Sequence, residues 1–184
     1  MRGDPWALPV ALLAVVAAAA VAWPMARRMK APVVPVWLFL ASVGGFLAAT
    51  VTPTAEAGQW SRHAASSFAV VFPSPAELHS LNVTSLNVLL GVPLGCASVW
   101  LAGEQRRWWP LLAAGTLPFA VEVIQHLLPV LGRSGFLLPD VIDNVVGLAA
   151  GGVLGALVFG IVWWWMRSSR HASSADPHPV NPSR

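Results

Sequence analysis

The sequence predicts an all-α, polytopic membrane protein, a bundle of about five transmembrane helices. Apolar residues make up 56% of the 184 residues and charged residues only 10%, whereas soluble domains carry roughly 25% charged residues. Several apolar stretches are long enough to cross a bilayer core, which takes about 20 helical residues. Basic residues gather after alternate stretches, as they do on the cytoplasmic side of membrane proteins.

Five apolar stretches read as spans, and together they leave no room for a separate soluble domain. The first could instead be a signal peptide, because Arg2 precedes its apolar core. Against that alternative, Asp4 offsets the positive start and the apolar run is long. The expected spans are Trp6–Met25, Val33–Thr52, Val83–Ala102, Trp108–Pro129 and Val141–Met166.

The distribution of charge predicts the orientation. Basic residues outside the predicted cytoplasmic segments are Arg2, Arg62 and Arg133, so we expect the N-terminus outside and the C-terminus in the cytoplasm. Most tryptophans fall near the predicted cytoplasmic ends, where an indole ring suits the bilayer interface. The cytoplasmic basic residues are Arg27, Arg28, Lys30, Arg106, Arg107, Arg167, Arg170 and Arg184.

We expect one transmembrane domain over residues 1–167, followed by a disordered cytoplasmic tail over 168–184, which has few apolar residues. The net charge of +3 would raise nucleic acid as a partner of a soluble protein. Here the basic residues follow the membrane topology, so we expect membrane lipids and no nucleic acid. The single cysteine, Cys96, excludes a disulfide framework and a thiolate metal cluster.

Polar residues inside the spans gather at one predicted depth, near the outer face. The fourth span carries Glu122 and Gln125 on one helical face. The fifth begins with a stripe of Asp140, Asp143 and Asn144. Ionisable groups in membrane helices are costly and usually paired or functional, so this convergence is the main functional signal in the sequence. Asn87 of the third span adds to it.

Small residues continue these polar stripes towards the cytoplasmic side. Gly147, Gly151 and Gly155 recur every four residues in the fifth span. In the third span, Asn87, Gly91 and Gly95 share a face. Small residues at this spacing let two membrane helices approach closely, so both stripes predict helix packing beneath the polar cluster.

Structural roles compete with functional ones at several of these positions. Asp140 and Asp143 resemble a helix N-cap and its third-position carboxylate. Glu122 could form a purely structural bridge to Arg133, or it could belong to a binding or catalytic site. His126, in the last turn of its span, reads as an interfacial residue. Asn87 and Asn144 could simply hydrogen-bond between helices.

No familiar cofactor or metal motif is present, and we expect no metal and no cofactor. An oxygen-ligand site for Mg²⁺ or Ca²⁺ within the Glu, Asp and Asn groups is a weaker alternative. His63, followed by Ser66 and Ser67, could suggest a base and nucleophile, but nothing in the sequence fixes their geometry.

The segment 86–155 resembles the VanZ-like membrane proteins. The resemblance rests on Leu86-Asn87-Val-Leu-Leu-Gly-Val-Pro93-Leu-Gly95, Glu122-Val-Ile-Gln125, Arg133, and Asp140-Val-Ile-Asp-Asn144-Val-Val-Gly147 with the glycines after it. It implies a bacterial multi-pass plasma-membrane protein of the cell envelope, linked to tolerance of glycopeptide antibiotics such as teicoplanin. The chain departs from the family in having Phe136 and Leu137 where an extra Asp is common. The pattern carries over onto Asn87, Pro93, Gly95, Glu122, Gln125, Arg133, Asp140, Asn144 and Gly147.

Three functions are compatible with this arrangement. In the first, the protein binds or shields a lipid-linked cell-wall precursor or a glycopeptide, with Arg133 contacting an anion and Asn87, Gln125, Asp143 and Asn144 among the ligand-binding residues. In the second, it is an enzyme, a hydrolase or transferase acting on a lipid-linked substrate, with Glu122 as acid or base and with Arg133 and Asp140 as further catalytic residues. The third is a small transporter, which five spans without a sequence repeat disfavour.

Overall fold

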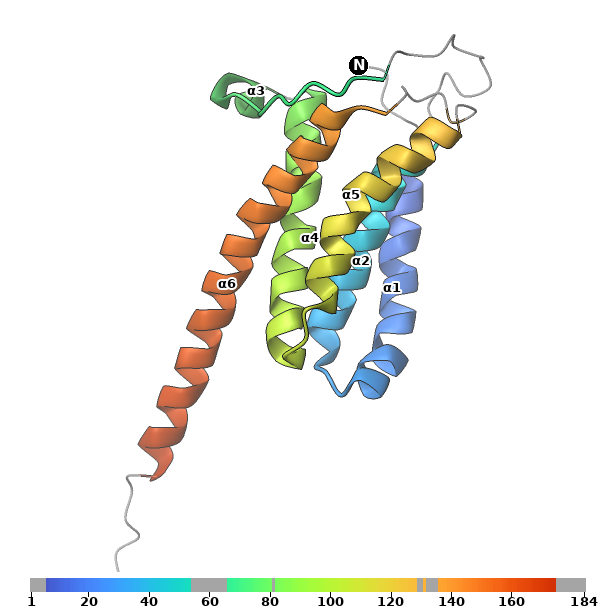
Figure 1. Ribbon diagram of the computed structural model, residues 1–184. Helices are drawn as coiled ribbons and strands as arrows, with labels where there is room; N and C mark the ends of the chain where they lie inside the picture. Colours follow the sequence, from blue (N-terminus) through green and yellow to red (C-terminus); the bar gives the residue numbers. More distant parts are fainter. Residues whose placement is uncertain (1–5, 54–65, 81, 129–130, 132–135, 175–184) are drawn as a thin grey trace, which may run out of the picture.

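The computed structural model describes residues 6–53, 66–80, 82–128, 131 and 136–174, and that part of the chain is helical with no β-strand. Five of its helices are long and apolar enough to cross a membrane, so the chain is a multi-pass membrane protein (Figure 1). A short helix, α3 (Pro75–His79), lies between the second and third of them. The five are α1 (Ala7–Met29), α2 (Val33–Val51), α4 (Val83–Gln105), α5 (Trp109–Leu127) and α6 (Leu138–Ser174).

The last helix differs most from its predicted span. It begins at Leu138, so Asp140 lies inside its first turn and not at an N-cap position. It ends at Ser174, so the first part of the segment that we expected to be disordered is helical; residues 175–184 lie outside the described part. Extending an existing helix costs little compared with nucleating one, which explains why the helix continues beyond the apolar stretch.

Two helical hairpins share the same dimensions. In each, a helix of 23 residues is followed by one of 19 residues: α1 with α2, and α4 with α5. Both first helices end on a left-handed residue, Lys30 (φ 52°) and Arg106 (φ 51°), whose N–H bonds back to the last helical turn. A non-glycine residue pays about 1–2 kcal/mol for this conformation, and in both hairpins the residue is basic.

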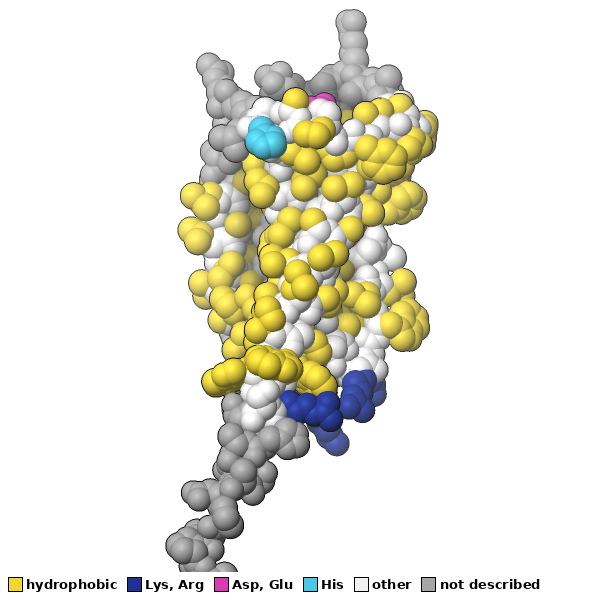
Figure 2. Space-filling view, turned by 90° about the vertical axis from the view of Figure 1, so that its left-hand side faces the viewer, with side chains coloured by type: hydrophobic (Ala, Val, Ile, Leu, Met, Phe, Trp, Pro, Cys, Tyr) yellow, Lys and Arg dark blue, Asp and Glu magenta, His cyan; other side chains and the backbone are white. Residues whose placement is uncertain are grey.

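The bundle has a small apolar core and a large apolar exterior. The side chains of Val36, Phe39 and Phe46 from α2 are buried against α4 and α5 residues such as Leu94 and Val121. In the five spans, only 11–33% of the most apolar window is buried, because lipid and not protein covers the rest. Figure 2 shows this apolar surface, with Lys and Arg side chains gathered at one end; we call that end the basic end.

The most extensive helix contact joins α4 and α6, which run side by side in Figure 1. Glycines form it: a Cβ on Gly147 would lie 2.0 Å from the carbonyl oxygen of Val88, and one on Gly95 would lie 2.2 Å from that of Leu148. Only a residue without a side chain fits at such distances. Gly151 and Gly155 continue the same contact further along α6.

Candidate functional site

Polar side chains are buried at the end of the bundle opposite the basic end, where α4 and α6 begin and α5 ends. Glu122 of α5 is only 3% exposed, and Asp143 and Asn144 of α6 are each 4% exposed. Such burial is unusual for these residue types unless they have partners. We call Glu122, Asp140, Asp143 and Asn144, together with Thr84, the polar cluster.

Glu122 joins α5 to the connection that leads into α6. Its Oε2 accepts a hydrogen bond of 2.9 Å from the backbone N–H of Leu137, just before α6 begins at Leu138. Glu122 has at least one further interaction besides this bond. The carboxylate thus points into the bundle and helps to fix the chain between the two helices.

A short extended contact completes this connection. Ser67 pairs with Leu137 in an isolated parallel bridge. Its N–H donates to the Phe136 carbonyl at 2.9 Å, and its own carbonyl accepts from Leu138 N–H at 2.8 Å. The segment from 136 to 138 is therefore held from both sides, by Ser67 on one and by Glu122 on the other.

The first turns of α6 hold the rest of the polar cluster. Asn144 Nδ2 donates to the backbone carbonyl of Asp140 at 2.8 Å, while its Oδ1 is buried and has no hydrogen-bond partner among the residues that the structure describes. Thr84, at the start of α4, lies near enough to the carboxylate of Asp143 to interact with it. Asp140 and Glu77 are near enough to Asp143 to repel its negative charge, so the cluster is rich in acceptors and acidic.

Gln125 has a partner in another helix. Its Nε2 donates a 2.6 Å hydrogen bond to the backbone carbonyl of Thr50, near the end of α2. The Thr50 hydroxyl donates in turn to the carbonyl of Phe46. Gln125 thus ties α5 to α2, and the ligand-binding role that we predicted for it stays a prediction.

Two other predicted residues fall differently. Asn87 is partly buried on α4, beside Val88, which contacts Gly147 of α6. Arg133 lies outside the described residues, as does His63. We predicted that Asn87, Glu122, Arg133 and Asp140 lie together. The structure describes three of these residues: Asn87 on α4, Glu122 on α5 and Asp140 on α6. Pro93, predicted to be structural, is exposed inside α4.

Metal binding finds no support among the residues that the structure describes. No group of three or more His, Cys, Asp or Glu side chains there could hold a metal ion. Asp140 lies instead in the first turn of α6, where a carboxylate interacts favourably with the helix dipole.

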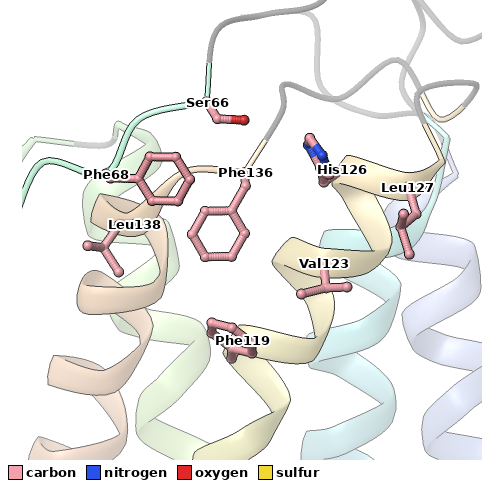
Figure 3. A pocket seen from close by; sticks show the side chains of 8 residues that line it. All are labelled: Ser66, Phe68, Phe119, Val123, His126, Leu127, Phe136 and Leu138. Carbon is pink, nitrogen blue, oxygen red and sulfur yellow. The ribbon is translucent and has the colours of Figure 1, made fainter.

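Sequence reasoning missed two features of this end. One is the contact between Thr84 and Asp143. The position of Thr84 in the first turn of its helix could have suggested this contact. An apolar pocket between α5 and α6 was also missed (Figure 3). Its lining comes from segments that are far apart in the chain, so no local sequence pattern indicates the pocket.

Comparison with known proteins gave no match: no protein-family model, no curated protein and no solved structure resembles the chain significantly. The resemblance to VanZ-like proteins therefore stays a prediction from the motifs.

Proposed function

We propose that this chain is a VanZ-like protein of the bacterial cell envelope, which binds a lipid-linked cell-wall precursor or a glycopeptide through its polar cluster. The observation that carries the proposal is the Oδ1 of Asn144, an acceptor in a 4% exposed residue that has no hydrogen-bond partner within the described part of the chain. Buried polar groups are nearly always paired, and leaving one unpaired costs about 1–3 kcal/mol. A ligand that donates a hydrogen bond to this oxygen would remove that cost.

The chemistry of the polar cluster narrows the ligand class. Asp140, Asp143 and Glu122 contribute carboxylates, and Asn144 contributes an amide oxygen, so acceptors predominate. A matching ligand presents hydroxyl or ammonium donors. Sugars and amino groups supply such donors, and lipid-linked precursors and glycopeptides both carry them.

The proposal places the polar cluster outside the cytoplasm. The described basic residues at the opposite end include Arg27, Arg28 and Lys30 at the end of α1 and Arg106 and Arg107 after α4. By the positive-inside rule that end faces the cytoplasm. The cluster then lies on the side of the outer leaflet, where cell-wall precursors are used and where glycopeptides arrive.

An Asn144→Ala variant tests the proposal. The probe is a polyprenyl-diphosphate disaccharide carrying a peptide, offered to the protein in nanodiscs, and native mass spectrometry measures the bound fraction. We expect at least a tenfold loss of affinity, corresponding to about 1.4 kcal/mol. The variant also loses the hydrogen bond from Nδ2 to the Asp140 carbonyl, so its folding is checked separately by thermal unfolding. Equal binding by wild type and Asn144→Ala would overturn the proposal.

Ser98→Ala is the matched control. Ser98 is a buried polar residue of α4 whose hydroxyl donates within its own helix, to the Gly95 carbonyl at 2.9 Å. We expect it to bind the probe like the wild type. If both variants lose binding equally, loss of packing and not of recognition explains the result, and the proposal fails.

A Glu122→Gln variant distinguishes the enzyme hypothesis from the binding hypothesis. The Leu137 N–H needs only an acceptor oxygen, and a glutamine side chain supplies one but cannot transfer a proton as a carboxylate does. The assay is the inhibitory concentration of teicoplanin in a sensitive bacterium that expresses the protein. If the protein acts by binding, we expect the variant to change this concentration as much as the wild type does. Complete loss of the effect with normal folding and normal probe binding would favour the enzyme.

A further inference from the structure

An apolar groove of about 430 Å³ lies between α5, the segment 136–138 at the start of α6 and residues 66–68. Its volume is within the range of ligand pockets. Figure 3 shows Ser66 and His126 at its upper rim and apolar side chains below them. These apolar side chains are Phe68, Phe119, Val123, Leu127, Phe136 and Leu138.

Aromatic rings shape the groove. The Phe136 ring stacks on Phe68 with centroids 5.5 Å apart and meets the edge of Phe119 at 5.6 Å. Both distances are typical of favourable ring pairs. Phe136 thus contacts α5 through Phe119 and the segment 66–68 through Phe68. The groove is therefore held in shape by packed side chains.

The groove opens onto the lipid-facing surface. Phe119 is 54% exposed and Leu127 is 67% exposed, in a helix that is apolar enough to span the membrane. Phe119 lies ten residues beyond Trp109, about 15 Å along the helix axis, within a hydrocarbon core about 30 Å thick. A water-soluble partner does not reach this depth, whereas a hydrocarbon chain is present there at all times.

The groove and the polar cluster share one wall. Phe136 and Leu138 line the groove, while the N–H of Leu137, the residue between them, donates to Glu122. Phe136 and Leu138 are two residues apart, so in an extended segment their side chains face the same side, while the backbone N–H between them bonds to Glu122. A lipid at the outer leaflet can therefore meet a polar surface and an apolar surface a few residues apart.

We infer that the groove holds a hydrocarbon chain of the same lipid whose head group binds the polar cluster. The inference rests on the proposed function and adds that the ligand is bound as an intact lipid, head group and chain together. Because the chain moves from lipid into a protein groove, the gain comes from packing against Phe68, Phe119 and Phe136 and not from removal from water.

Val123→Trp tests the inference by filling the groove with a large side chain. Val145→Trp is the matched control: it is the same substitution on α6, at a residue that is 45% exposed and does not line the groove. Two probes are used in nanodiscs, the polyprenyl-diphosphate disaccharide-peptide and the same head group released from its chain. Native mass spectrometry again measures the bound fraction.

The expected result is a selective one. Val123→Trp should weaken binding of the lipid probe at least fivefold while leaving binding of the chain-free head group unchanged, and Val145→Trp should change neither. Equal lipid binding by Val123→Trp and Val145→Trp would overturn the inference, as would a wild type that binds both probes equally well. Loss of both probes in Val123→Trp would also overturn it, since the groove would then not act on the chain.

The failure of this inference is distinguishable from failure of the proposed function. If Asn144→Ala weakens both probes but Val123→Trp weakens neither, the cluster binds the head group and the groove takes no part. If Asn144→Ala weakens neither probe, the proposed function is wrong, and a chain effect of Val123→Trp then reports a lipid contact unrelated to the cluster.

Discussion

The glycine contact between α4 and α6 makes a quantitative prediction for Gly151→Ala. A Cβ at Gly151 would lie 2.0 Å from the Val92 carbonyl oxygen, 2.7 Å from its carbonyl carbon and 2.8 Å from its Cα. All three atoms belong to backbone, so no side-chain rotation relieves the clash. Ordinary contact begins near 3.4 Å, and in a close-packed interface the two helices would have to separate locally by about 1.4 Å.

The expected magnitude follows from two opposing effects. Overpacking of a close-packed interface costs about 1–3 kcal/mol, while replacing glycine by alanine in a helix gains up to about 1 kcal/mol. We therefore expect Gly151→Ala to lower the free energy of unfolding by about 1–2 kcal/mol. Gly160→Ala on the same helix meets nothing within 4 Å, so only the gain applies and the variant should be as stable as the wild type or more so.

The assay is reversible unfolding of purified protein in mixed micelles with increasing SDS, followed by helical circular dichroism. A second readout is the labelling rate of Cys96, the single cysteine of the chain. Cys96 lies in the same contact, since a Cβ on Gly155 would be 2.6 Å from its carbonyl oxygen. Labelling should be faster in Gly151→Ala. If Gly151→Ala and Gly160→Ala unfold at the same SDS fraction, the helices are not packed as closely as described and the reasoning is refuted.

Two further predictions concern hydrogen bonds at the polar-cluster end. Glu122→Ala removes the acceptor of the Leu137 N–H, so we expect about 1–3 kcal/mol of destabilisation and faster hydrogen exchange of the 136–138 peptide by mass spectrometry; unchanged exchange would contradict the assigned bond. In α3, hydrogen bonds from the Ser74 hydroxyl and N–H lower the pKa of Glu77 below its ordinary 4.5. Since that pKa is lowered, the capping contact stabilises α3 above about pH 4.5 and is lost as the pH falls through the folded-state pKa. Ser74→Ala should move the pKa of Glu77 back towards 4.5, as followed by NMR titration, and a value unmoved by the substitution would contradict this origin of the shift.

Hydropathy predicted the membrane helices well because a bilayer imposes a length and a composition on each span. The starts of α2 and α4, at Val33 and Val83, coincide with the predicted starts. The ends were less predictable. Lys30 and Arg106 adopt a left-handed conformation that sequence rules assign to glycine, and the first turn of α6 begins before Asp140 because Leu138 and Pro139 suit a helix start.

The candidate site was predictable only in part. Helical periodicity put Glu122 and Gln125 on one helical face, and both side chains are buried. The contact of Glu122 with the Leu137 N–H depends on how the connection folds back, which no local pattern encodes. The same holds for Gln125, whose partner Thr50 lies in a helix far away in the sequence. Residue depth in a membrane is a one-dimensional property and can be read from sequence, whereas partners depend on the three-dimensional packing of the helices.

The glycine contact also bears on the proposed ligand binding, because it helps to fix the position of Asn144, whose Oδ1 is the unpaired acceptor. A Cβ on Gly91 would lie 2.5 Å from the backbone oxygen of Asn144, so the close approach of α4 and α6 includes the turn that carries that side chain. Asn144 Nδ2 is held by its hydrogen bond to the Asp140 carbonyl, and the neighbouring Asp143 is 4% exposed. With these restraints the free Oδ1 has little freedom to turn towards a protein partner. A rigid support of this kind is what a preorganised binding group requires, and it explains how the fold keeps a costly unpaired acceptor in place.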